Sequence, residues 1–437
     1  MLVPGFMSAM AHLADTRAVF SLGQLLEPGT FFAEEGFTVP PVLGALIRIR
    51  NDTLFATPEG RAIFTNPATG QPYVAGDVMK QPDLAAFLHN VSADGVATMY
   101  GGRWAQAAVG RLAGLGGNLT VTDFAAYHTE ESEPLTATFR GHKVTTSSSP
   151  FGGIDLVEQS NLLEVSGVGG RPSANATAFY WLIQFTRWTQ TVSPIAHTSP
   201  YLLNVVEAKF QLNLTDAGRA TVEHAKKLWG IMSAPGGIAR INAFWKSLEG
   251  GPPAPSHLHS DGVVAADDAG NVCSMIHTAN TATWSGGVFV DGVLFPNAGA
   301  TFGAYASAAP LGGRVPTPKH PSIVLNTTTG LPSAAISVVG AGLSEYTLQT
   351  LAAVVDGGLD PAQAVDMPFF YGMNTSAAGG FPAGEKVRDG DFPEQFIADV
   401  EALGQPLVTM TTQEALDCMG VPVALSVNAT TIAAGAT

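Results

Sequence analysis

The stretch around Ser260 has the residue types and order that could carry acyl-transfer chemistry. A Gly- and Pro-rich loop, Ser247 to Ser256, precedes it, and an apolar run, Gly262 to Ala266, follows it. If the chain is cut just before Ser260, the serine hydroxyl and a new α-amino group belong to one residue. Such an amine has a pKa near about 8, so it can accept the hydroxyl proton directly or through water. The alternative is an ordinary turn serine between a loop and a strand.

A predicted β-hairpin would position Ser260. Gly262 to Ala266 and Val272 to Thr278 are apolar and β-rich, and the turn-forming run Asp267 to Asn271 joins them. Earlier segments, such as Met7 to Leu26 and Ala174 to Thr191, have helical spacing instead. The order of elements, with helices first and a β-rich part after them, predicts an α+β layered sandwich rather than alternating βαβ units. Further elements are expected as strands at Gly287 to Phe295 and Ile336 to Val339 and as a helix at Tyr346 to Val355.

Short motifs surround the hairpin in a fixed order. The hairpin offers Ser260, the turn Asp267 to Asn271, and Thr278-Ala279-Asn280. Upstream stand Val3-Pro4-Gly5, Gly116 to Thr120 with Asp123 to Tyr127, Arg140-Gly141 and Ser149 to Gly153. In this order the chain resembles the gamma-glutamyltranspeptidase family. The family's small subunit opens with a Thr, a strand, a D-x-x-G-N-like turn and a second strand that ends in T-x-N.

The resemblance implies a fold, a cleavage and a reaction. The expected fold is a four-layered αββα sandwich of the N-terminal nucleophile hydrolase type, forming one domain. The chain would cut itself between His259 and Ser260, because the Ser260 hydroxyl attacks the His259 carbonyl in an N→O acyl shift. Residues 1–259 and 260–437 would then stay associated as large and small fragments. Ser260 stands where the family has its nucleophilic Thr and would form the acyl-enzyme in amide hydrolysis or acyl transfer.

Four further positions take roles from the resemblance. Thr278 matches a Thr that orients the nucleophile, although an ordinary strand Thr is the alternative. Asn280 matches a substrate-contacting Asn. Gly340 and Gly342 lie at the family's glycine pair, whose backbone N–H groups face the developing oxyanion; here Ala341 interrupts the pair. A plain strand-to-helix turn is the other interpretation of this loop.

The expected substrate pocket departs from the family pattern. Ala298 and Thr301 stand where the family has an amide or acid and an Asp that hold the γ-glutamyl amino group. Lost charge-assisted partners weaken binding of an ammonium by roughly 1.5–3 kcal/mol each. Thr317-Pro318 keeps one hydroxyl of a carboxylate-binding Ser pair, and Arg314 is either a replacement anion binder or a solvated surface residue.

These matches and departures predict an autoprocessed, glutathione hydrolase-like enzyme acting on a small-molecule amide, glutathione or a related compound. The alternatives are an acylase acting on non-glutamyl amides, or an inactive secreted pseudoenzyme or fragment. No cofactor is expected. No metal is expected either, because His257 and His259 lack a third ligand nearby.

Charge and glycosylation motifs restrict the setting. The net charge of -15 over 437 residues argues against nucleic acid as a partner. Eight N-x-S/T sequons predict a glycoprotein of the secretory pathway or the cell exterior; they begin at Asn51, Asn90, Asn118, Asn175, Asn213, Asn326, Asn374 and Asn428. Because the chain begins at the family's V-P-G point, we expect a truncated start with the signal segment missing. The pairing of Cys273 with Cys418 stays open.

Overall fold

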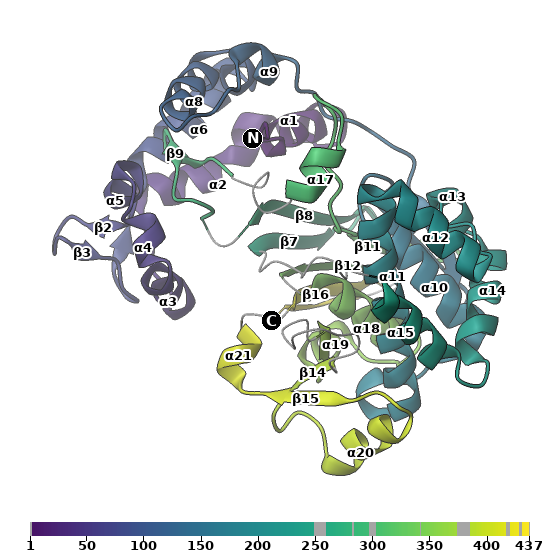
Figure 1. Cartoon of the computed structure of the whole chain (residues 1–437). Helices are drawn as coiled ribbons and strands as arrows, with labels where there is room; N and C mark the ends of the chain where they lie inside the picture. The colour runs from purple at the N-terminus through teal and green to yellow at the C-terminus, as the bar shows by residue number, and fades with distance from the viewer. Residues whose placement is uncertain are drawn as a thin grey trace. The chain divides into compact units, whose positions relative to one another are not determined.

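The computed structural model describes residues 2–248, 259–281, 284–296, 303–340, 342–373, 385–416, 420–427 and 431–436 (Figure 1). The chain forms two compact units, Met1–Glu131 with Ala279–Gly303 and Ser132–Thr278 with Ala304–Thr437. Each unit contains chain from both sides of the predicted cleavage bond at His259/Ser260. The predicted large and small fragments are products of the cleavage, and their boundaries do not coincide with those of the two compact units.

The first unit is mainly helical. Its elements are α1 Phe6–Thr16, α2 Leu22–Glu35, β1 Phe37–Thr38, α3 Pro41–Ile49, α4 Asn51–Leu54, α5 Pro58–Phe64, β2 Thr65–Asn66, β3 Gln71–Pro72, β4 Val78–Met79, α6 Pro82–Asp94, α7 Ala97–Tyr100, α8 Arg103–Ala113, α9 Val121–Ala125, β9 Phe289–Val290 and β10 Val293–Leu294. Trp104 is central to its core, and its indole N–H donates to the Val290 carbonyl over 3.0 Å.

Two sequence predictions in this unit are wrong. The helix expected over Met7 to Leu26 is two helices, because Ser21 and Gln24 form a capping box that starts α2. The single strand expected at Gly287 to Phe295 is a pair of short antiparallel strands. Asp291 and Gly292 turn the chain between them, with φ of 47° and 75°.

The second unit contains the predicted hairpin and most of the β-structure. Its elements are β5 Leu135–Phe139, β6 His142–Thr146, α10 Gly153–Ser166, the 3-10 turn η1 Pro172–Ala174, α11 Ala176–Thr198, α12 Pro200–Phe210, α13 Asp216–Arg219, α14 Val222–Ser233, α15 Gly237–Ser247, β7 His259–Ala266, β8 Val272–Thr281 (whose last residues fall in the first unit), α17 Gly303–Ala308, β11 Ser322–Asn326, β12 Pro332–Gly340, α18 Leu343–Val355, α19 Pro361–Asp366, β13 Phe370–Met373, β14 Glu385–Arg388, α20 Glu394–Ala402, β15 Leu407–Met410, α21 Thr412–Leu416, β16 Gly420–Val427 and β17 Ile432–Ala436.

A six-stranded sheet in the order β17-β16-β12-β11-β6-β5 forms the middle of this unit. Every neighbouring pair in it is antiparallel. α10, α18 and α19 pack on one face, where Val324, Ile336 and Val338 join the main apolar core. β7 packs on β12 and β16 from the opposite face (Figure 1). The unit therefore has a helical layer, a large sheet and a two-stranded sheet stacked in that order.

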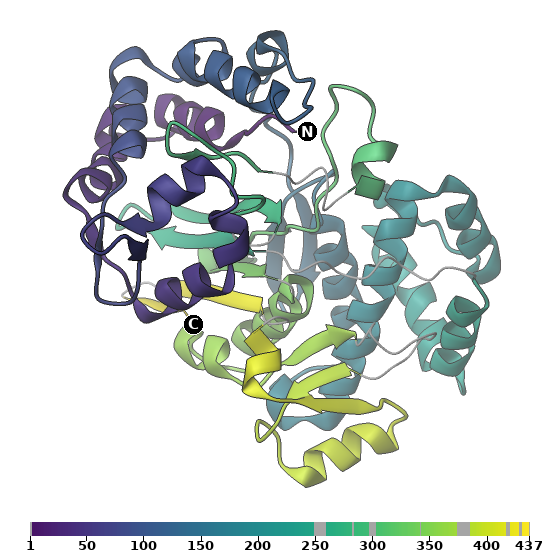
Figure 2. The same cartoon turned by 60° about the vertical axis from the view of Figure 1, so that its left-hand side comes forward.

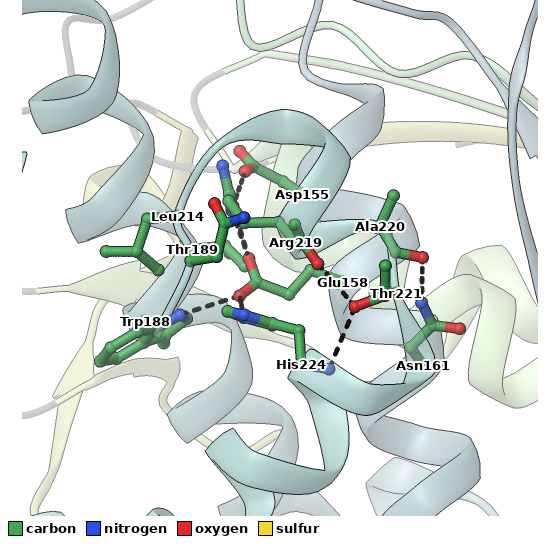
Figure 3. Close-up of polar contacts among 12 residues, drawn as sticks. Asp155, Glu158, Asn161, Trp188, Thr189, Leu214, Arg219, Ala220, Thr221 and His224 are labelled. Carbon is green, nitrogen blue, oxygen red and sulfur yellow. Dashed lines mark hydrogen bonds and ion pairs between the residues drawn. The ribbon is translucent and has the colours of Figure 1, made fainter. Parts of the chain in front are cut away.

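The helical layer is held together by a buried polar cluster, which we call the Arg219 cluster: Asp155, Glu158, Trp188, Ser193, Arg219 and His224. These residues come from α10, α11, α13 and α14, and Figure 3 shows Asp155, Glu158, Trp188, Arg219 and His224 gathered around one another. Arg219 donates to Glu158 over 2.7 Å and to Asp155 over 2.6 Å. Helices α11 to α15, in teal, gather together in Figure 2.

None of the described helices is long and apolar enough to cross a membrane.

Candidate active site

Ser260 and Thr278 face each other across the hairpin. The Ser260 hydroxyl donates a hydrogen bond to Thr278 Oγ1 over 2.5 Å, in a half-buried position. The two residues come from β7 and β8 and were predicted together as nucleophile and orienting hydroxyl. A hydroxyl held in this way keeps one direction instead of sampling all its rotamers, as a nucleophile needs.

The turn between the strands explains why these two residues meet. The Asp267 carboxylate accepts hydrogen bonds from the backbone N–H groups of Ala269 and Asn271 and from the Asn271 side chain. Hydrogen bonds from the Asn271 side chain and backbone lower the pKa of Asp267. Asp267 N also donates to Asn271 O over 3.1 Å, and Ser260 and Thr278 each lie seven residues outward from this pair. The turn thus sets the register of the site.

Contacts between the two sheets align the hairpin with β12. Ser274 Oγ donates to Ile336 O, and Ser337 Oγ donates to Met275 O, each over 2.8 Å. Gly262 lies opposite the next part of β12, because a Cβ there would be 2.9 Å from Ser337 Oγ and 3.4 Å from Val339 Cγ1. Hairpin positions closer to Ser260 therefore contact positions of β12 that are closer to Gly340. The nucleophile end of the hairpin therefore lies toward the end of β12.

The end of β12 is where the predicted oxyanion loop lies. Gly340 is its last residue, with φ of +94°, and Gly342 is the N-cap of α18. Ala341, between them, lies outside the described residues. The first backbone N–H groups of a helix have no partner within the helix, and its N-terminus carries a partial positive charge. A strand end followed by a helix start can thus direct donors at a developing oxyanion.

Thr317 lies at the same end of the sheet. Its backbone N–H donates to Pro150 O over 3.1 Å, and Thr317 forms an isolated parallel β-bridge with Phe151. Because Ser322 pairs with Ile336 in the antiparallel β11–β12 ladder, the chain before Ser322 runs toward the level of Gly340. Gly152 is required in this contact, since a Cβ there would be 2.7 Å from the Pro318 carbonyl carbon. The Ser149 to Gly153 motif therefore supports the segment that carries Thr317.

The structure brings together part of the predicted site. Ser260 and Thr278 are in contact through their hydroxyls, and Gly340, Gly342 and Thr317 lie at the end of the large sheet toward which this end of the hairpin runs. His259 and Asn280 lie in β7 and β8, but their side chains are outside the described residues. Ala298, Thr301 and Cys418 also lie outside them. The catalytic and substrate-binding roles of all these residues stay predictions.

The sequence reasoning missed Lys319 and His320, which follow Thr317 by two and three residues. Lys319 is 4% exposed and its Nζ has no hydrogen-bond partner among the described residues. Burial lowers the pKa of Lys319 to about 7 and that of His320 to about 4. A Lys-His pair before Pro321 is typical of a polar loop. Only its position just after Thr317 could have drawn attention to it.

The described ranges contain no group of three or more His, Cys, Asp or Glu side chains that could hold a metal ion. Cys273 is a free thiol, and burial raises its pKa.

Comparison with known proteins relates this geometry to a family. The sequence model described as gamma-glutamyltranspeptidase matches residues 1–436. The acylase ACY 1 proenzyme of Pseudomonas sp. (strain SE83) is 26% identical over 380 residues, which are 84% of this chain and 63% of that protein. The glutathione hydrolase proenzyme of Pseudomonas sp. (strain A14) is 26% identical over 389 residues, 84% of this chain and 64% of that protein. The chain thus spans less than two thirds of each curated relative.

A solved structure gives the same picture of the fold. The crystal structure of cephalosporin acylase from Bacillus halodurans aligns with a TM-score of 0.76 at 19% identity, covering 98% of this chain and 75% of that one. The predicted α+β fold of the N-terminal nucleophile hydrolase type is confirmed. From the match over residues 1–436, the chain belongs to the gamma-glutamyltranspeptidase family.

Proposed function

We propose that this chain belongs to an autoprocessed amide hydrolase or acyltransferase that forms its acyl-enzyme on Ser260. The observation that carries the proposal is the 2.5 Å contact between the hydroxyls of Ser260 and Thr278, at the hairpin end directed toward the α18 N-terminus. Family membership and relatives named as acylase and glutathione hydrolase proenzymes support the reaction class.

The first proposed step is cleavage of the chain itself. Ser260 Oγ attacks the His259 carbonyl carbon, and the bond from that carbon to Ser260 N breaks. The product is an ester on Ser260 and a free α-amino group, and water then hydrolyses the ester to leave a carboxylate on His259. Thr278 orients the attacking oxygen by accepting its hydrogen bond.

The second proposed step uses the amine that cleavage releases. The Ser260 α-amino group accepts the hydroxyl proton while Oγ attacks the amide carbonyl of the substrate. The N–H groups after Gly340 stabilise the oxyanion, and the proton passes to the departing amine. Water or a second amine then takes the acyl group from Ser260. The large and small fragments stay associated throughout.

Mutation of the two hydroxyls tests the proposal. Ser260→Ala should remain a single chain on a denaturing gel and hydrolyse no acyl-p-nitroanilide. Thr278→Val should slow both reactions by roughly 10–100-fold, because the nucleophile loses its orienting partner. Thr281→Val, three residues further along β8, is the matched control. An uncut wild-type chain, or a Ser260→Ala chain that is still cut after His259, would contradict the assignment.

A non-glutamyl acylase is the second candidate. One of the two curated relatives compared is named an acylase, and the solved neighbour is a cephalosporin acylase. Rates on γ-glutamyl-p-nitroanilide and on anilides of other acyl groups distinguish the two. A strong preference for the γ-glutamyl group would exclude this candidate.

We further propose that the protein is an N-glycosylated member of the secretory pathway or the cell exterior. In the described ranges, the sequon residues Asn51, Asn118, Asn175 and Asn213 are exposed, and Asn90 and Asn326 are half-buried. An accessible amide is what the glycosylation machinery requires. Expression in secreting eukaryotic cells should give a mobility shift on treatment with peptide N-glycosidase. A chain without glycans in such cells would contradict this proposal.

A further inference from the structure

The first unit has an open groove at the place where α6, α7, α8 and α9 meet, and three of these helices are labelled together in Figure 1. Its volume is about 720 Å³, within the range of about 300–1,000 Å³ that is typical of small-molecule sites. All of its lining residues lie between Asn90 and Ala125, so the groove belongs to one unit.

The wall of the groove on the side of α7 has a fixed position. Tyr100, the last residue of α7, is 8% exposed. Its hydroxyl donates to Pro4 O over 2.6 Å and accepts a hydrogen bond from Ser8 N over 3.2 Å. Its ring stacks on that of Tyr127, with the centroids 5.4 Å apart. These contacts tie α7 to the start of the chain and to the residues after α9, so this wall does not move into the groove.

Two glycines between α7 and α8 shape the floor. Gly102 is needed for a close approach, because a Cβ there would be 2.9 Å from Thr98 Cα. Gly101 has more room, since a Cβ there would meet only the Cβ of Ala125, at 4.0 Å. The chain therefore turns tightly into α8 and leaves space on the side of Ala125.

The lining has the mixed chemistry that suits a sugar. Asp94 and Arg103 are exposed, and Thr98 is half-buried. A carboxylate accepts hydrogen bonds, a guanidinium donates them and a hydroxyl does both. Ala97 and Ala125 add methyl groups. A sugar ring carries hydroxyl groups on its edge and C–H groups on its faces, so it can use both kinds of surface.

Asn90 provides the point of attachment for such a ligand. It is half-buried, it lines the groove, and it begins the sequon Asn90-Val91-Ser92. A glycan on its side-chain amide starts at the wall of the groove. Because the link is covalent, the sugars act at the high effective concentration of an intramolecular ligand, and modest contacts are enough to hold them.

We propose that the groove holds the first sugars of an N-glycan attached to Asn90. This inference rests on the proposed N-glycosylation of the protein and assigns a binding site to one of its glycans. The glycan covers the junction of α6, α7 and α8 and stabilises the first unit.

Release of glycans from the folded protein by peptide N-glycosidase tests the proposal, because the glycan must leave the groove before the enzyme can act. Asn118 is the matched internal control, since it is exposed, lies in the same unit and does not line the groove. In protein from secreting eukaryotic cells, mass spectrometry should show release at Asn90 about tenfold slower than at Asn118. After denaturation the two rates should be equal.

A variant that fills the groove should remove this difference. Ala97 is exposed and is the first residue of α7, so Ala97→Trp places a large side chain in the groove. Release at Asn90 should then be as fast as at Asn118. Ala113→Trp adds the same side chain at an exposed position of α8 that does not line the groove, and should keep the tenfold difference.

Thermal unfolding gives an independent readout. In glycosylated protein, Asn90→Gln should lower Tm by about 2–4 °C, and Asn118→Gln should change it by less than about 1 °C. In protein made by cells that attach no glycans, Asn90→Gln should leave Tm unchanged, because the contact that it removes is with the sugars.

Four results would overturn the inference. They are equal release at Asn90 and Asn118 from the folded wild type, a difference that survives in Ala97→Trp, an Asn90→Gln shift that persists without glycans, and an Asn90 that carries no glycan. If other sequons are glycosylated in the last case, the proposal of a glycoprotein stands and only the groove assignment fails. A protein without glycans at any sequon would overturn both.

Discussion

The Arg219 cluster and Lys319 show two opposite ways to bury a charge in one unit. Arg219 is 1% exposed and is fully engaged with Asp155, Glu158 and Ser193. Lys319 is 4% exposed, and its Nζ has no hydrogen-bond partner among the described residues. The paired charges join α10, α11 and α13, whereas the unpaired one lies in the segment between Thr317 and β11. The two buried cations therefore differ in how completely the protein pairs them.

The pKa values in the Arg219 cluster follow from its pairing. Burial raises the pKa of Glu158, but Arg219 and His224 outweigh it, so the pKa lies below its ordinary value. For Asp155 burial wins over Arg219 and Ser193, and the pKa lies above its ordinary value. Burial lowers the pKa of Arg219, but the two carboxylates outweigh it and raise the pKa. Arg219 thus lowers the pKa of both Asp155 and Glu158 and favours their ionised forms.

The largest expected effect comes from removing that cation. Arg219→Met leaves Asp155 and Glu158 buried without their counter-charge, and should lower the free energy of unfolding by about 3–5 kcal/mol. Urea unfolding followed by circular dichroism measures it. Arg240→Met, at an exposed arginine in α15, should stay within about 0.5 kcal/mol. A similar small loss for Arg219→Met would mean that the pairing does not stabilise the helical layer.

Removing the charge of Lys319 is expected to raise the free energy of unfolding, where removing that of Arg219 lowers it. The effect at Lys319 depends on pH. The folded pKa is about 7 against an unfolded value of 10.5, so the unfolded state binds more protons between these values. The stability contribution of this group therefore rises with pH, by on the order of 2 kcal/mol between pH 7 and 9. Lys319→Met should lose this slope and be more stable than wild type at pH 7. Parallel pH profiles of wild type and variant would contradict an unpaired cation.

A smaller effect is expected at Glu385 in β14, which is only partly paired. Its Oε1 lies 3.4 Å from Arg187 Nε, but neither carboxylate oxygen has a hydrogen bond among the described residues. Burial raises its pKa to about 7 against an ordinary 4.5, with Arg187 opposing and Glu345 adding to the rise. Wild type should therefore lose about 1–2 kcal/mol as pH rises from 5 to 7. Glu385→Gln should remove this loss, and a variant with an unchanged pH profile would refute it.

The smallest effect is expected for an exposed pair in the first unit. His89 Nε2 and Glu34 Oε1 are 2.7 Å apart, with side chains 59% and 47% exposed. Solvent screens such a pair, so Glu34→Gln should change the free energy of unfolding by less than about 1 kcal/mol. Thermal unfolding of the two proteins measures the difference. A loss as large as that of Arg219→Met would show that burial does not determine how much an ion pair contributes to the free energy of unfolding.

Local patterns predicted the parts of the site that local chemistry builds. The Asp267 to Asn271 turn and its flanking strands were evident from residue types, and the Ser260–Thr278 contact follows from the register of that turn. The start of α2 was missed, although Ser21 and Gln24 form a capping box. The helical spacing over Met7 to Leu26 continues through the break between α1 and α2 and so does not reveal it.

Long-range packing accounts for what the sequence did not predict. Asp155 and Glu158 look like the polar face of a surface helix, but α10 is covered on all sides and Arg219 comes from a helix far along the chain. Lys319 is buried in a segment whose backbone contacts Gly152, which is far from it in the sequence. Neither of these long-range contacts produces a periodic pattern in the neighbouring sequence that would have predicted it.

The mass of the purified chain tests the central claim most directly. If Ser260 cuts its own chain, the 45.2 kDa protein should give two fragments whose masses add to that of the chain plus one water. N-terminal sequencing of the smaller fragment should begin at Ser260-Asp261-Gly262, and Ser260→Ala should give one intact mass. A wild type of intact mass, or a new N-terminus at any other residue, would contradict the account.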